Sequence, residues 1–250
     1  LAVLSRNSGE FSLLHAIVLG IIEGISEYLP VSSTGHLLVA QNLMGLTKTD
    51  AAKSAADAYA IIIQIGAILA VTGLYRNRVK QMIMGLFGRD QSGLNLIFRL
   101  IIAFIPAALM GLLFSNMIKQ VLFGLLPISI AWFIGGLIII IFAAGPPAKH
   151  SNMSVSIDSM SMKQALIIGL IQILALWPGV SRSLATILGG LVAGLTLPFA
   201  VEFSFLLGLI TLCAATCYEM LKSGGEVIFS YGWFLPAIGI FSSFISAWIA

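Results

Sequence analysis

Charged residues are scarce in this sequence. Only 13 Lys and Arg and 10 Asp and Glu occur among 250 residues, so that 9% of the chain is charged, whereas soluble domains carry about 25%. Hydrophobic residues make up 59% of the chain, more than the roughly 45–50% that is usual in soluble domains. This composition excludes an ordinary water-soluble fold and indicates a helical membrane protein.

A basic block of the kind that nucleic-acid binding requires is also missing. The formal charge is only +3 and its residues are spread along the chain, so we expect no nucleic-acid partner. The two cysteines, Cys213 and Cys217, lie one helical turn apart in an apolar stretch, which is typical of packing rather than metal or redox chemistry. Residues 1–10 lack the basic start and cleavage pattern of a signal peptide, so we expect no removable leader.

Long apolar runs are present instead. A helix needs roughly 20 apolar residues to cross a bilayer core of about 30 Å. Stretches of about this length predict five spanning helices, at 58–75, 94–116, 122–145, 199–221 and 232–250. The predicted fold class is an all-α polytopic membrane protein with one membrane domain.

Two further apolar regions, 11–46 and 163–197, are interrupted by Pro and Ser at 30–33 and 178–181. As helices, most of their pieces would reach only roughly 20 Å, which is too short for a crossing. Each region is therefore predicted to form a re-entrant helical hairpin. Its broken tip would be enclosed by protein, because lipid leaves free backbone groups unsatisfied.

The interrupted regions belong to an internal repeat with an offset of 149 residues, which divides the chain into halves 1–150 and 151–250. Several residues coincide with identical residues under this offset: Ala16, Gly20, Ile22, Val31, Ser32, Gly45, Leu46 and Thr47. If the first hairpin crosses nothing and three spans follow it, the second hairpin begins on the opposite side of the membrane. This inverted topology predicts a site near the midplane, where the tips meet, and a further span after residue 250.

The predicted orientation rests on a small excess of basic residues, which favour the cytoplasmic side. One side of the membrane is predicted to hold Arg76, Arg78, Lys80, Arg89, Lys149 and Lys163, and the other Arg6, Lys48, Lys53, Lys119 and Lys222. We therefore predict that the first group is cytoplasmic.

Two carboxylates lie in the first hairpin. Gly20, Glu23, Gly24 and Glu27 recur at i, i+3, i+4 and i+7, which places them on one helical face. The glycines allow another backbone to approach closely, and an ionised carboxylate at the membrane centre costs at least about 2.5–3.5 kcal/mol. Neighbouring carboxylates repel one another, so this pair either shares a proton or binds a cation. We predict that Glu23 and Glu27 bind a divalent cation, Mg²⁺ or Ca²⁺, because oxygen ligands suit these ions. The alternative is that both side chains lie at the headgroup level.

The first break precedes a helix N-terminus that is suited to an anion. Pro30 ends one helix, Ser32 or Ser33 can cap the next, and His36 falls within its first turn. Free N–H groups and the positive end of the helix dipole attract phosphate there. A simple capped turn would explain the serines but would leave His36 unexplained.

The second break repeats this arrangement and adds an arginine within apolar sequence. Ser181, Arg182 and Ser183 follow Pro178, and Thr186 comes one helical turn after Arg182. A guanidinium binds phosphate oxygens in a bidentate manner and stays charged. The alternatives are a structural ion pair of Arg182 with one of the two carboxylates, and simple helix packing for Thr186. Gln64 and Glu202 are predicted to lie outside this site.

These motifs resemble a known family. The runs EGISEYLPVSSTGH at 23–36 and PGVSRSLAT at 178–186 resemble the two signature boxes of the undecaprenyl diphosphate phosphatases of the bacitracin-resistance family. The resemblance extends through most of the chain, including 64–66 and 202–205. Two departures are Leu184, where the second box usually has glycine, and the absence of the last spanning helix.

The resemblance implies a multi-pass enzyme of the bacterial plasma membrane that removes the terminal phosphate of undecaprenyl diphosphate, the lipid carrier of cell-wall synthesis. It also implies a divalent cation and an active site open to the outer, periplasmic face. We predict that Glu27, Ser33, His36 and Arg182 are catalytic, and that Arg182 binds phosphate together with Ser32, Ser181, Ser183 and Thr186. Whether Ser33, His36 or water attacks phosphorus stays open, as do the oligomeric state and any lipid flipping. The alternative function is a secondary transporter or polyprenyl-phosphate flippase built on the same repeat.

Overall fold

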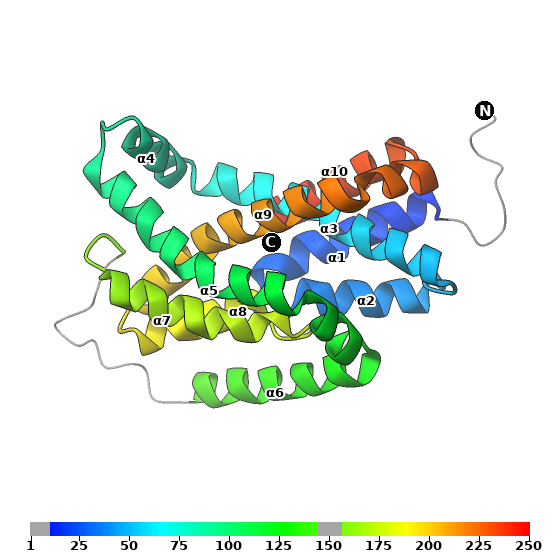
Figure 1. Cartoon of the computed structure of the whole chain (residues 1–250), viewed down its shortest axis with the longest axis horizontal. Helices are drawn as coiled ribbons and strands as arrows, with labels where there is room; N and C mark the ends of the chain where they lie inside the picture. The colour runs from blue at the N-terminus through cyan, green and yellow to red at the C-terminus, as the bar shows by residue number, and fades with distance from the viewer. Residues whose placement is uncertain (1–10, 145–156) are drawn as a thin grey trace. The chain divides into compact units, whose positions relative to one another are not determined.

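The computed structural model describes residues 11–144 and 157–250, and these residues form helices and no β-strand (Figure 1). The predicted boundary between the halves, together with Arg6 and Lys149, lies outside the described residues. The elements in chain order are α1 (Leu13–Tyr28), α2 (Ser33–Leu43), α3 (Asp50–Leu74), α4 (Arg76–Leu86), α5 (Gln91–Leu122), α6 (Leu125–Ala144), α7 (Met162–Gln172), the short 3-10 helix η1 (Ile173–Leu176), α8 (Arg182–Val192), α9 (Leu197–Tyr231) and α10 (Phe234–Ile249).

Four of these helices are long and apolar enough to cross a membrane. Their apolar segments are Asp50–Leu74, Gln91–Ile118, Leu125–Phe142 and Leu197–Gly225, which confirms the predicted all-α polytopic class. The fifth predicted span forms α10, which has only 16 residues. At about 1.5 Å per residue these residues reach roughly 24 Å, and the fifth crossing stays a prediction.

Helix α4 was not predicted, because the basic residues after α3 suggested a loop. It packs against α5 through two glycines. A Cβ atom at Gly85 would lie 2.7 Å from the carbonyl carbon of Gly93, so the two backbones meet without side chains between them. This contact holds the basic segment as a helix beside α5.

Both predicted helix interruptions are present. The chain leaves α1 after Tyr28 and re-enters a helix at Ser33, and it leaves α7 after Gln172 and starts α8 at Arg182. Pro30 and Pro178 lie within these two breaks, where no backbone N–H is needed for a helical hydrogen bond. The breaks therefore leave two new helix N-termini.

The local structure repeats with the same offset of 149 residues. Leu13 and Met162 begin α1 and α7, and Leu43 and Val192 end α2 and α8. Ser12 and His15 exchange hydrogen bonds at the start of α1, as Ser161 and Gln164 do at the start of α7. Gly45 and Gly194 both have positive φ, 70° and 91°. The inverted orientation of the halves stays a prediction.

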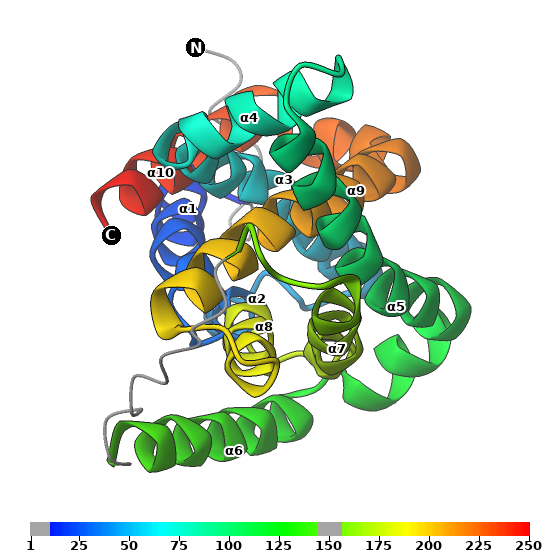
Figure 2. The same cartoon turned by 90° about the vertical axis from the view of Figure 1, so that its left-hand side faces the viewer.

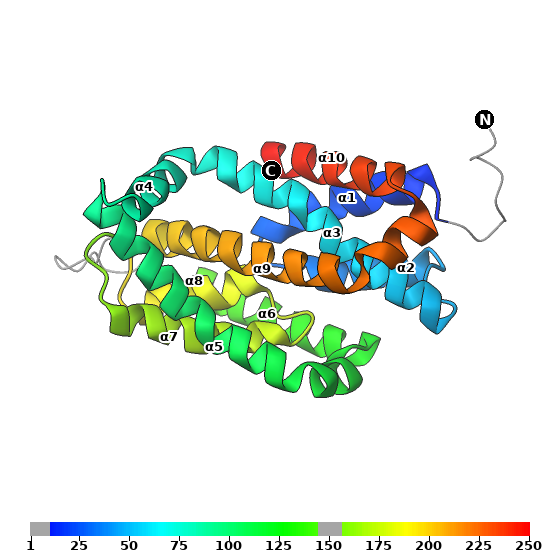
Figure 3. The same cartoon turned by 45° about the horizontal axis from the view of Figure 1, so that its top comes forward.

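The chain divides into two compact units, and the first contains 11–26, 36–70 and 212–250 of the described residues. Within it α10 runs beside α1 (Figure 3). A Cβ atom at Gly20 would lie 2.5 Å from the carbonyl oxygen of Gly239, and one at Gly66 in α3 would lie 2.7 Å from Ser243 Cβ. The predicted close approach to the glycine face of α1 is confirmed, and α10 is the partner.

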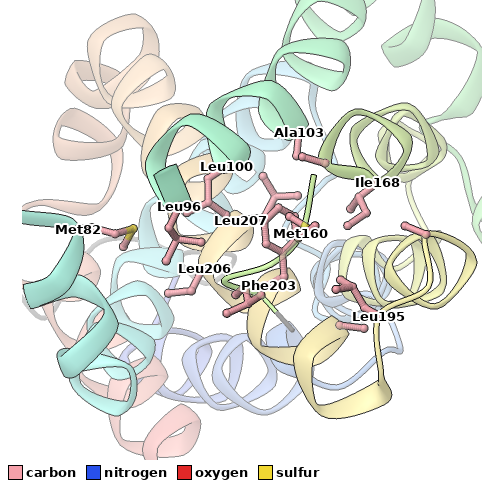
Figure 4. Close-up of a cluster of buried hydrophobic side chains, with 14 residues drawn as sticks. Met82, Leu96, Leu100, Ala103, Met160, Ile168, Leu195, Phe203, Leu206 and Leu207 are labelled. Carbon is pink, nitrogen blue, oxygen red and sulfur yellow. The ribbon is translucent and has the colours of Figure 1, made fainter. Parts of the chain in front are cut away.

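The second unit contains 27–35 and 71–211. Here α7 and α8 lie side by side (Figure 2), and α7 packs on α5, where a Cβ atom at Gly169 would lie 2.8 Å from Ala103 Cα. Helices α4, α5, α7 and α9 enclose an apolar core (Figure 4). Its large members include Met82, Leu96, Leu100, Met160, Ile168, Leu195, Phe203, Leu206 and Leu207.

Candidate active site

The first break forms a tight turn that ends in a capped helix. Ser32 has a φ of 68°, which is uncommon for a residue with a side chain and occurs often at functional sites. Its Oγ accepts a hydrogen bond from Gly35 N at 3.4 Å, so Ser32 rather than Ser33 caps α2. The hydroxyl of Ser33 is thereby free to point elsewhere.

The second break is capped in the equivalent way. Ser181 Oγ accepts from Leu184 N at 3.2 Å and lies 2.8 Å from Ser183 Oγ. Ser183 Oγ in turn donates to the carbonyl oxygen of Leu29 at 3.3 Å. Because Leu29 belongs to the first break, this bond joins the two tips. The predicted meeting of the two N-terminal tips is present within the second unit.

The Glu27 carboxylate lies at this junction. Its Oε1 accepts from Arg182 Nη2 at 3.0 Å, and its Oε2 accepts from the Ser33 hydroxyl. Glu27 and Ser33 are only 7% and 5% exposed. A buried charge requires a partner of opposite charge and further hydrogen bonds, and Arg182 and Ser33 supply both to Glu27. Three predicted catalytic residues are therefore in direct contact.

Helix α9 supplies a hydrogen-bond acceptor for Arg182. Arg182 Nη1 donates to the carbonyl oxygen of Ser204 at 3.1 Å. The Nε atom of Arg182 is buried and has no hydrogen-bond partner among the residues that the structure describes. The Thr186 hydroxyl lies 2.6 Å from Ser204 Oγ, and its predicted contact with phosphate stays a prediction.

The first half of α6 covers both tips. A Cβ atom at Gly35 would lie 2.8 Å from Trp132 Nε1, and one at Gly179 would lie 2.9 Å from Ala131 Cβ. Trp177 Nε1 donates to the carbonyl oxygen of Pro127 at 3.2 Å. Helix α6 thus packs against both tips, whereas the side chains of Leu29 and Val31 in the first tip are exposed, so the predicted enclosure of the tips is only partial.

Two predicted site residues belong to the first unit. Glu23 in α1 is fully buried, and His36 in the first turn of α2 is partly exposed. Their proposed roles rest on the sequence: Glu23 lies one helical turn before Glu27, and His36 three residues after Ser33. The assignments of Glu23 to metal binding and of His36 to catalysis stay predictions.

Glu202 and Gln64, which were predicted to lie outside the site, are absent from the contacts around Glu27. Glu202 accepts from Arg78 Nε at 2.7 Å, and Arg78 also pairs with Asp158 at 3.1 Å. Burial by itself lowers the pKa of Arg78. The hydrogen bonds and negative charges of Glu202 and Asp158 raise the pKa by more than burial lowers it, so the net shift is upward. Burial, with the charge of Glu202, raises the pKa of Tyr75. This network ties α4 to α9 and to the segment before α7.

A divalent cation is the predicted cofactor, and Glu27 is the predicted ligand that lies in the second unit. No group of three or more His, Cys, Asp or Glu side chains occurs in the described parts of the chain. A Mg²⁺ ion, however, is usually held by one or two carboxylates together with substrate phosphates and water. Glu27 is one such carboxylate in the second unit, and the part of Glu23, which belongs to the first unit, stays a prediction.

Comparison with known proteins decides the family. A family model described as "Bacitracin resistance protein BacA" matches residues 16–250. Undecaprenyl-diphosphatase 1 of Chromobacterium violaceum is 44% identical over 238 residues, 95% of this chain and 85% of that protein. The undecaprenyl-diphosphatases of Nitrosospira multiformis and Ectopseudomonas mendocina are 41% and 43% identical over 96% and 94% of this chain, and 84% and 81% of their own lengths. The chain belongs to the BacA family.

In this BacA protein, sequence reasoning missed the carbonyl groups that hold the site together. The carbonyls of Leu29 and Ser204 accept from Ser183 and Arg182. Every residue carries a carbonyl, so no residue type marks these two. Ser204 does lie in the segment 202–205 that carries the family resemblance, and this was the one available signal.

Proposed function

We propose that this chain is an integral membrane phosphatase that hydrolyses undecaprenyl diphosphate to undecaprenyl phosphate and inorganic phosphate. The BacA family and the undecaprenyl-diphosphatases that are 41–44% identical to it support this activity. The observation that carries it is the buried contact of Glu27 with both Ser33 and Arg182. This contact brings together the Ser33 hydroxyl, the Glu27 carboxylate as a base and the Arg182 guanidinium as the proposed phosphate-binding group.

Ser33 is the proposed nucleophile. A hydroxyl that is hydrogen-bonded to a base is the arrangement expected of an activated nucleophile. Ser33 Oγ attacks the terminal phosphorus, its proton passes to Glu27, and the bond from phosphorus to the oxygen of undecaprenyl phosphate breaks. Water then hydrolyses the phosphoserine and releases inorganic phosphate. His36 is the alternative nucleophile, and direct attack by water is a third route.

The remaining donors stabilise charge on the transferred group. Arg182 would bind phosphate through its guanidinium, which carries a fixed positive charge, while Nη1 stays on Ser204. The N-termini of α2 and α8 direct free N–H groups to the same tips, an arrangement that favours anions. Ser32, Ser181, Ser183 and Thr186 are the hydroxyls proposed to assist. Such preorganised donors supply most of the catalysis in phosphoryl transfer.

A divalent cation, Mg²⁺ or Ca²⁺, is proposed to bind through Glu23 and Glu27. When bound, the ion would neutralise negative charge on the diphosphate. Glu27 also holds the Ser33 hydroxyl and Arg182, and Glu23 brings the second carboxylate into the apolar interior. Removing the ion is expected to abolish turnover.

We place the enzyme in the bacterial plasma membrane with its site open to the outer face. The basic residues of α4, together with Arg89 and Lys163, favour the cytoplasmic side for their own part of the chain, because cytoplasmic loops carry an excess of Lys and Arg. The diphosphate of the substrate would lie at the tips and its prenyl tail in the surrounding lipid.

One assay tests this function against transport. Purified protein in detergent is given a polyprenyl diphosphate with and without a chelator, and released phosphate is measured. Phosphate release that needs the metal and is lost in Glu27→Gln is the expected result, because detergent offers no second compartment. A transporter or flippase would release no phosphate under these conditions.

A further inference from the structure

Helices α8 and α9 meet along a series of small side chains in steps of one helical turn. A Cβ atom at Gly190 would lie 2.7 Å from Ala200 Cβ, and Thr186 Oγ1 lies 2.6 Å from Ser204 Oγ. The third step pairs Arg182 with Gly208. Each step goes four residues back along α8 and four forward along α9, so the helices are antiparallel and Arg182 faces Gly208.

The third step differs because the large side chain of Arg182 replaces a small one. A Cβ atom at Gly208 would lie 2.6 Å from both Cζ and Nη2 of Arg182, closer than real Cβ contacts allow. The Ser204 carbonyl, one turn earlier in α9, accepts from Nη1 at 3.1 Å. The guanidinium thus lies against bare backbone at Gly208, and the same group reaches Glu27 through Nη2 at 3.0 Å.

We propose that Gly208 is a positioning residue for Arg182. It touches no substrate and acts by leaving the space in which the guanidinium binds Ser204 and Glu27 together. This inference rests on the proposed function and adds to it the residue that sets where the phosphate-binding cation stands. An arginine has many rotamers, and a fixed seat removes most of them before substrate arrives.

The thermal midpoint and the phosphatase rate are measured for four proteins: unaltered, Gly208→Ala, Arg182→Lys and the double variant. Lysine keeps the charge but has no planar group at Gly208. We expect Gly208→Ala to lower kcat by at least about tenfold with a smaller change in KM, because small displacements of reacting groups carry costs of this order. In the Arg182→Lys background the same change should lower kcat by less than about twofold.

Gly225→Ala is the matched control, because Gly225 also lies in α9 and has nothing within 4 Å of its Cβ position. We expect it to leave the rate unchanged and the thermal midpoint equal or slightly higher, because alanine favours helix over glycine. Gly208→Ala should lower the thermal midpoint when Arg182 is present and not when lysine replaces it. If Gly208→Ala itself does not fold, recovery of folding in the double variant still supports the proposal that Gly208 leaves space for the Arg182 guanidinium.

Equal losses from Gly208→Ala in both backgrounds would overturn the proposal, because Gly208 would then serve helix packing alone. Full activity of Gly208→Ala or of Arg182→Lys would also overturn it. Failure of the proposed function looks different: the unaltered protein would release no phosphate. In that case the thermal midpoints alone still decide whether Gly208 seats the guanidinium.

Discussion

Glu27 accepts hydrogen bonds from two side chains that differ in what they could do to a phosphate ester. Arg182 brings a fixed positive charge, and Ser33 brings a hydroxyl that a base could activate. Because Glu27 is only 7% exposed, each partner also stabilises a carboxylate that would otherwise be costly to bury. Substitutions here therefore affect both chemistry and folding, and an experiment must separate the two.

Arg182→Ala is expected to lower turnover by more than about tenfold, a loss of at least about 1.4 kcal/mol. The substitution also removes the positive charge beside the buried Glu27 and leaves only the hydrogen bond from Ser33, so the thermal midpoint should fall. Adding Glu27→Gln removes the uncompensated charge and should restore the midpoint without restoring the rate. Retention of more than a tenth of the rate in Arg182→Ala would remove this residue from the centre.

The chemistry of the intermediate distinguishes Ser33 from His36. Phosphoserine survives acid whereas phosphohistidine does not. Protein that is mixed with substrate labelled in its terminal phosphate and then quenched in acid should therefore retain labelled phosphate on Ser33. Ser33→Ala should abolish both label and turnover. Ser129→Ala is the control, because the exposed Ser129 hydroxyl donates only to the carbonyl of Leu125 in its own helix. Acid-labile label would indicate His36, and no label would indicate direct attack by water.

The residue types at this centre could be predicted, and the ion pair of Arg182 with Glu27 was one of the alternatives that the sequence left open, but the hydrogen bonds of Ser32 and Ser33 could not be predicted. Carboxylates, an arginine and paired serines in apolar sequence have few other uses, which identified Glu27, Ser33 and Arg182. That Ser32 caps α2 and leaves Ser33 to Glu27 depends on the positive φ of Ser32, which no local sequence rule indicates. The seat at Gly208 depends on the register of two helices, which is a tertiary property.

At the scale of helices, close packing in this protein is carried by glycine. Gly169 in α7 approaches the backbone of α5 at Ala103, whose carbonyl also accepts from Gln172 Nε2 at 3.4 Å. Neighbouring helices in lipid gain little from the hydrophobic effect, so close contact between small residues provides much of their attraction. The spacing of α5 and α7 therefore depends on one missing methyl group.

Gly169→Ala is expected to lower the free energy of unfolding by about 1–3 kcal/mol, the usual cost of forcing a methyl group into a packed interface. Gly136→Ala in α6 is the control, because nothing lies within 4 Å of its Cβ position. Alanine favours helix over glycine, so the control should be neutral or slightly stabilising. Thermal unfolding in detergent measures both, and equal midpoints would contradict the close contact.

Hydropathy located the spanning helices better than it located their ends. It found the apolar segments of α3, α5, α6 and α9 but ended the last near residue 221, whereas α9 continues to Tyr231. It also missed α4, which carries Arg76, Arg78 and Lys80 on a helix of 11 residues. Apolar length reports burial in lipid, and a helix that continues past the lipid or lies beside another helix leaves no such signal.

For the whole molecule, the internal repeat predicts on which side of the membrane equivalent positions lie, which composition alone does not predict. The two hairpins share the starts of α1 and α7, both bounds of α2 and α8, the first helix caps and the positive-φ glycines at an offset of 149 residues. Three of the four helices long enough to cross, α3, α5 and α6, lie between them in the sequence. An odd number of crossings places equivalent positions of the two repeats on opposite sides of the membrane.

Lys48 and Leu197 are equivalent under this offset, follow α2 and α8, and are both exposed. Cysteine is introduced at each position in a background in which Cys213 and Cys217 are alanine. A maleimide that cannot cross membranes should label Lys48→Cys in intact cells and Leu197→Cys only after permeabilisation, because the basic α4 side is predicted to be cytoplasmic. The reverse result would keep the inverted repeat and exchange inside for outside. Labelling of both cysteines from one side would mean an even number of crossings between them, and the two halves would then be parallel copies rather than inverted ones.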